Sequence, residues 1–153
     1  MTANIRIDSA VLEQLLPAVA AAERYAAETR EAVRARVAAS SLDAEQRAAH
    51  GYAWVETSVA AMRATLDWLQ IADAANRAHA QEWLTVIIGI SETLAQLTGG
   101  LPMGQNEIVR PVDMGSGEAA GSGTRGRLVV EPWQYGRQPG CAGHLYGRWQ
   151  CSR

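Results

Sequence analysis

Apolar residues recur at spacings of three and four through three long segments of the chain, which is the period of an α-helix. The first predicted helix runs from about Asp8 to Ala38, where Asp8 or Ser9 can cap its free amides. Pro17 lies inside this segment and predicts either a kink or a later start of the helix. The apolar stripe of the segment consists of Leu12, Leu15, Leu16, Val19, Ala26, Val33 and Val37.

The second predicted helix runs from about Ala44 to Asp73 or Ala75, after a turn in which Ser41 or Asp43 can cap the new helix. One stripe along it is clearly apolar and consists of Tyr52, Val55, Val59, Met62, Leu66 and Leu69. A second face carries small residues between two tryptophans and consists of Trp54, Ser58, Ala61, Thr65 and Trp68. Because two tryptophans are costly to leave in water, this helix is expected to be covered on both faces.

The third predicted helix runs from about Ala75 or Arg77 to Thr98, with Gly99-Gly100 as a left-handed C-cap and Pro102 preventing continuation. Its apolar stripe consists of Trp83, Val86, Ile87, Ile90, Leu94 and Leu97. The pattern thus predicts an all-α fold, a three-helix bundle-like fragment. Since three such helices bury little unless they pair, the two-faced second helix predicts a homodimer that completes a four-helix arrangement.

Composition changes near Gly115. Residues 1–114 are rich in Ala and Leu and acidic, whereas residues 115–153 have no helical period, are weakly basic, and are rich in Gly, Arg and Trp. We therefore predict a helical domain over 1–114 and an irregular tail over 115–153, in which RLVVEPW is the one segment that suggests a short strand. The tail holds both cysteines, Cys141 and Cys151, which can pair, bind a metal or stay as thiols; in a cytoplasmic protein thiols are expected.

Several classes of function are excluded by these patterns. The basic residues are too sparse for a nucleic-acid interface. No stretch is long and apolar enough to cross a membrane, and the N-terminus lacks the apolar core of a secretory signal, so a cytoplasmic location is expected. The motifs GxGxxG, GxxxxGK[ST], HExxH and GxSxG do not occur in the sequence.

Two stretches carry a family resemblance, EQRAAHGYAWVETSVAAMRATLDW (Glu45–Trp68) and IGISETLAQLTGGLPMGQNEIVRP (Ile88–Pro111). They resemble the N-terminal helical region of a bacterial branch of the acyl-CoA dehydrogenase family. The resemblance covers about residues 8–114 and stops at the change in composition.

The resemblance implies a shortened relative of that family. Its members are several times longer, and they hold the flavin, the acyl thioester and the catalytic carboxylate mainly in two later domains. Without a flavin site there is no hydride acceptor, so we expect no FAD and no dehydrogenase activity. The residue mixture of the tail is typical of GC-rich DNA translated out of frame, which suggests a truncated gene joined to an unrelated reading frame.

The remaining candidates for chemistry are histidines and carboxylates. His79 and Glu82 lie three residues apart, a spacing at which both can bind one metal ion on a helix. His50 lies on the second helix and can meet His79 only across a two-fold dimer. His144 lies between the two cysteines of the tail and can complete a helical site. The alternatives without a metal are a hydrogen bond at the helix end for His79 and a partly exposed position beside an aromatic residue for His50.

Two functions follow from these candidates. The first is a small hydrolase in which zinc or another divalent metal, held by His50, His79, Glu82 and His144, supplies a hydroxide that attacks a small-molecule substrate. Activated esters such as phosphotriesters are the easiest targets for such a hydroxide. The alternative is a non-catalytic helical dimerisation fragment of an acyl-CoA dehydrogenase with no flavin site. No catalytic residue is assigned from the sequence.

Overall fold

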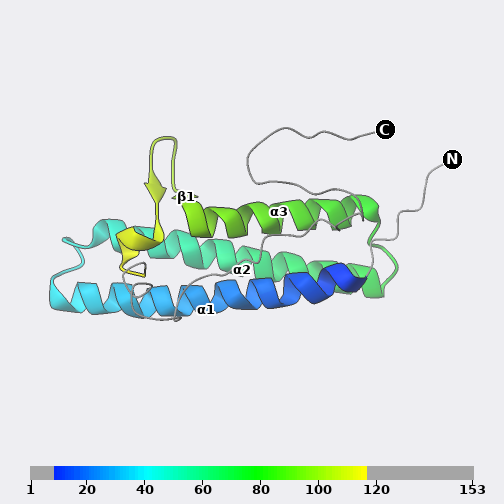
Figure 1. The fold of residues 1–153 in the computed structure, drawn as a ribbon, viewed down its shortest axis with the longest axis horizontal. Coiled ribbons are helices and arrows are strands. Elements are labelled where there is room, and N and C mark those ends of the chain that lie inside the picture. Colours follow the sequence, from blue (N-terminus) through cyan, green and yellow to red (C-terminus); the bar gives the residue numbers. More distant parts are fainter. Residues whose placement is uncertain (1–8, 117–153) are drawn as a thin grey trace, which may run out of the picture.

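A computed structural model describes residues 9–116, and these residues form three long antiparallel helices followed by a short hairpin (Figure 1). The helices are α1 (Ser9–Ala39), α2 (Gln46–Ala74) and α3 (Ala80–Gly99). Helix α2 lies in the middle, with α1 on one side and α3 on the other (Figure 1). The predicted all-α, bundle-like fold is therefore confirmed. Apart from Gly115 and Ser116, the predicted tail lies outside the described residues.

Helix α1 begins at Ser9 and continues through Pro17, so the late start offered as one explanation of Pro17 is wrong. Pro17 is exposed, and its ring therefore stays out of the core. In the predicted stripe, Leu15 and Val19 are almost completely covered, whereas Leu12, Leu16 and Val37 are half-buried at the edge of the core.

Helix α2 begins at Gln46, two residues later than predicted. The later start of the helix has a local cause. The Ala44 amide donates to the Ser41 hydroxyl (3.2 Å), and the Glu45 amide donates to the Ser41 carbonyl (3.2 Å). These bonds form a turn before the helix. Ser41 therefore caps this turn rather than the helix itself.

The connection between α2 and α3 also differs from the prediction, since α3 begins at Ala80 and not near Ala75 or Arg77. Asn76 adopts a left-handed conformation (φ 53°), and the Arg77 amide donates to the Ala72 carbonyl (2.8 Å). This is the usual way for a helix to end when a short polar residue takes the left-handed position. The chain then needs a few extended residues before the next helix can start.

After α3 the chain forms a small antiparallel hairpin. Strand β1 (Leu101–Pro102) pairs with β2 (Ile108–Val109), Leu101 facing Val109, and a 3-10 helix, η1 (Pro111–Met114), follows. Gly100, which precedes β1, has a positive φ of 143°, and a side chain there would collide with Ile108. Glycine is therefore required where α3 turns into the hairpin.

Arginines on α1 and α2 hold this hairpin region in place. Arg47 donates to the Ile108 carbonyl (2.8 Å) and to the carboxylate of Glu107 (3.2 Å). Arg36 donates to the Asp113 carbonyl (3.0 Å). Gly51 of α2 lets Val109 approach so closely that a Cβ atom at this position would lie 2.5 Å from a Val109 methyl carbon.

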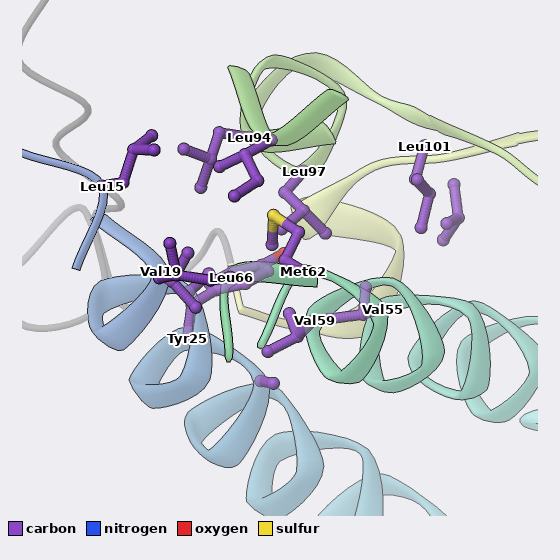
Figure 2. Packing of buried hydrophobic residues seen from close by; sticks show 14 of the residues in the cluster. Leu15, Val19, Tyr25, Val55, Val59, Met62, Leu66, Leu94, Leu97 and Leu101 are labelled. Atoms are coloured by element: carbon purple, nitrogen blue, oxygen red, sulfur yellow. The ribbon is translucent and has the colours of Figure 1, made fainter. Parts of the chain in front are cut away.

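The core lies where the three helices face one another, and Figure 2 shows its side chains converging from all of them. Leu66 and Leu69 are fully covered, and the hairpin region closes one end with Val109 and Met114. Two hydroxyls of α1, those of Tyr25 and Thr29, are buried and make no hydrogen bond within the described part of the chain. The other core residues labelled in Figure 2 are Leu15, Val19, Val55, Val59, Met62, Leu94, Leu97 and Leu101.

Candidate functional site

A groove of about 380 Å³ runs between α2 and α3. None of the residues that line it is charged, and most of them are small or apolar. The α2 side consists of Ser58, Ala61, Met62 and Thr65, and the α3 side of Thr85, Val86, Gly89, Ile90, Thr93 and Gln96.

The second face predicted for α2 borders this groove. Trp54 and Trp68 lie at the two ends of this face and are 39% and 51% exposed, so residues 9–116 leave both partly uncovered. The expected need for a second cover thus persists in the folded chain. An exposed apolar surface of this kind suits contact with another protein surface.

Several hydrogen-bond donors of this surface already have partners in the described part of the chain. The Trp54 indole N–H donates to Nε2 of His50 (3.0 Å). The hydroxyls of Thr65 and Thr93 donate to the carbonyls of Ala61 and Gly89 one turn earlier (2.8 Å each). Each of these three donors keeps its hydrogen bond when the surface is covered, so covering them costs little.

His50, one of the predicted metal ligands, lies on α2 beside Trp54, with the two rings 6.4 Å apart. Because its Nε2 atom accepts the indole hydrogen bond, the lone pair of that nitrogen is occupied. His50 thus lies beside an aromatic residue, as the alternative without a metal expected, and the two side chains are hydrogen bonded.

His79 and Glu82 are brought together, but as a helix cap. His79 is the N-cap residue of α3, and its backbone amide donates to the Glu82 carboxylate (2.9 Å). Backbone amides of Glu82 itself and of His79 hold the pKa of this carboxyl below its usual range. The carboxylate is therefore engaged in starting the helix, at a place where the helix dipole also favours negative charge.

The predictions of a metal-binding site, of zinc and of a hydrolase are wrong. Within residues 9–116, no three His, Cys, Asp or Glu side chains come together in a way that could hold a metal ion. His50 and Glu82 make the bonds described above, and two ligands are too few for a metal that must activate water. His144, Cys141 and Cys151 lie outside the described residues.

The α3 side of the groove was missed in the sequence. Thr85, Gly89 and Thr93 recur at intervals of four residues and so lie on one helix face, but the stronger apolar stripe of this helix drew the interpretation to its core side. A repeat of small residues at spacing four is the signal that could have located this wall.

Comparisons with known proteins place the chain near one group of enzymes. It is 35% identical over 92 residues to (2S)-methylsuccinyl-CoA dehydrogenase from Cereibacter sphaeroides. The match covers 60% of this chain but 17% of that protein, so the chain spans a small part of its relative. No family model and no solved structure matches the chain.

The match supports a distant relationship to the acyl-CoA dehydrogenases, which agrees with the family that the sequence resembles. The match gives no support to the hydrolase interpretation, which also lacks a metal-binding group within residues 9–116. No helix within residues 9–116 is long and apolar enough to cross a lipid bilayer.

Proposed function

We propose that this chain is a non-catalytic helical module, related to the acyl-CoA dehydrogenases, that acts by dimerising through the exposed face of α2 and α3. The observation that carries the proposal is the uncharged groove between these helices, with Trp54 and Trp68 exposed beside it. Covering exposed apolar surface with a partner is favourable, because it removes that surface from water.

A flavin dinucleotide does not fit this groove. A dinucleotide needs cationic side chains or a glycine-rich helix start for its two phosphates. The ten residues that line the groove offer hydroxyl, amide and apolar side chains and no positive charge. We therefore derive no hydride transfer from these residues and expect the module to bind no FAD.

The similarity supports relationship rather than activity. Since the chain matches 17% of the length of its relative, the dehydrogenase chemistry of that protein is not carried over. A shortened gene with an unrelated tail, a cytoplasmic location and the absence of nucleic-acid and membrane partners remain predictions from the sequence.

The test combines oligomeric state with cofactor content in the full chain. Multi-angle light scattering across a range of concentrations should give a dimer mass, and the visible spectrum of the purified protein should lack flavin bands. A strictly monomeric chain would overturn the dimerisation, and co-purified flavin with oxidation of an acyl-CoA would overturn the non-catalytic assignment.

A further inference from the structure

The exposed surface of α2 carries the same residues in both directions from its centre. Starting at Ala61, threonine lies four residues away on each side and tryptophan seven residues away on each side. We call this set, which consists of Trp54, Thr57, Ala61, Thr65 and Trp68, the palindromic stripe. All five residues are exposed. Offsets of four and seven keep them on one side of the helix.

A palindrome matters because of how identical chains pair. In a two-fold interface the same patch is used twice, and when residue i contacts residue j, residue j contacts residue i. For two antiparallel copies of α2 crossing at Ala61, each Trp54 therefore meets Trp68 of the second copy. The small residue at the crossing point lets the two helices come close, while the large rings close both ends.

Helix α3 repeats this symmetry on the other wall of the groove. Thr85 and Thr93 lie four residues before and after Gly89, and a Cβ atom added at Gly89 would meet no atom within 4 Å. Ala61 and Gly89, the centres of the two symmetric patterns, both line the groove. A single two-fold axis that passes beside both residues would satisfy both helices at once.

The charges agree with a second copy as the occupant. The palindromic stripe has no ionisable residue, so pairing it with itself places no like charges opposite each other. The acidic residues nearest to it on α2 already have partners in their own chain: Glu56 accepts a hydrogen bond from Tyr52 (3.0 Å), and Asp67 lies 3.9 Å from Arg63. The threonine hydroxyls are satisfied as well, since Thr57 and Thr65 donate to carbonyls of their own helix (2.8 Å each).

The exposed area is also of the right order. A tryptophan side chain that offers about 200–250 Å² in total leaves about 80–130 Å² uncovered at the exposures of Trp54 and Trp68. Four such rings in a dimer supply about 350–450 Å², roughly a third of the 1,200 Å² at which stable interfaces begin. The remaining area must come from the small residues of both helices that lie beside these rings.

We propose that two copies of this chain pair antiparallel through the palindromic stripe, with the two-fold axis beside Ala61 and Gly89. This inference rests on the proposed function, because it specifies the surface and the geometry of the dimer. In this dimer, α2 of one copy contacts α2 of the other along the palindromic stripe, beside the groove.

Disulfide trapping tests the axis. In the full chain, with Cys141→Ser and Cys151→Ser removing the native thiols, Ala61→Cys places one cysteine at the proposed axis. Ala95→Cys is the matched control, because Ala95 is an exposed alanine of α3 outside the groove. We expect both variants to be dimers by light scattering and mild oxidation to cross-link only the Ala61→Cys variant, since a disulfide requires Cα atoms within about 7 Å.

A second pair of variants measures the energetic role of the same point. Ala61→Glu places two like charges at the axis and should weaken dimerisation at least about tenfold, whereas Ala95→Glu should leave it unchanged. Circular dichroism of each variant establishes that the helices are retained. A dimer that fails to cross-link at residue 61 and tolerates Ala61→Glu overturns this geometry but leaves the proposed function intact. A parent chain that is monomeric at every concentration overturns both.

Discussion

Replacing Gly51 with alanine tests how the hairpin region is docked onto α2. In an ordinary helix interior this change is stabilising by roughly 0.5–1 kcal/mol, because alanine loses less backbone entropy on folding. At Gly51, however, the new Cβ atom would lie 2.5 Å from a methyl carbon of Val109 and 3.3 Å from the sulfur of Met114. Such a contact is far shorter than van der Waals separation, so something must move.

The magnitude follows from which atom must move. Val109 is 1% exposed and β-branched, so its methyl group has no free rotamer to adopt. Overpacking of this kind costs typically 1–3 kcal/mol, which exceeds the gain in helix propensity. We therefore expect Gly51→Ala to lower the free energy of unfolding by about 0.5–2 kcal/mol, the difference between the two terms.

The assay is urea unfolding followed by circular dichroism at 222 nm, at one fixed protein concentration. Gly89→Ala is the matched control, since it adds the same methyl group inside α3 with no atom of its own chain within 4 Å. At a protein concentration below that of dimerisation it should raise stability by about 0.5–1 kcal/mol. Val109→Ala should cancel part of the loss in a Gly51→Ala background, because it removes the colliding methyl. The reasoning is refuted if Gly51→Ala stabilises the chain as much as Gly89→Ala does.

Three further perturbations have defined outcomes. Burial raises the pKa of Tyr25, so the folded chain keeps the phenol proton at a higher pH than the unfolded chain does. The free energy of unfolding should therefore fall as the pH rises beyond the ordinary tyrosine pKa, and Tyr25→Phe should weaken that dependence in urea titrations at alkaline pH. The paired hydrogen bonds from Arg63 (2.7 and 2.9 Å) lower the pKa of Glu23, so their contribution should be present at neutral pH and disappear as the pH falls through the lowered value. Because the pair is partly exposed, Glu23→Gln should cost less than about 1 kcal/mol at pH 7 and nothing in acid; an equal loss at both pH values would contradict this. Arg47→Ala should speed amide hydrogen exchange around Glu107 while leaving α1 unchanged, whereas uniform acceleration would mean that the bonds of Arg47 support the whole bundle.

The sequence predicts only those parts of the candidate site that depend on residues close together along the chain. The second face of α2 was found because Trp54 and Trp68 break the polar surface expected of an exposed helix, and periodicity alone places them together. The other wall of the groove was missed because Thr85, Gly89 and Thr93 look like ordinary helix surface until α2 is laid beside them.

The predicted metal ligands failed for a similar reason. A spacing of three residues does place His79 and Glu82 together, but it cannot tell a shared metal from a helix cap. The choice was made by backbone geometry, because α3 starts at Ala80 and its free amides need an acceptor. At His50 the nearest partner is Trp54, one turn away, and their hydrogen bond occupies the nitrogen that a metal would need.

The sequence by itself determined the three helices, their buried stripes and the all-α class, because a period of 3.6 residues is a local property that any apolar stripe records. Only the tertiary structure decided the hairpin after α3, which exists because Gly51 admits Val109 and because Arg47 on α2 is placed to bind the Ile108 carbonyl. Contacts between residues some 60 positions apart leave no periodic trace along the chain. They arise when packed helices bring distant backbone groups within hydrogen-bond range.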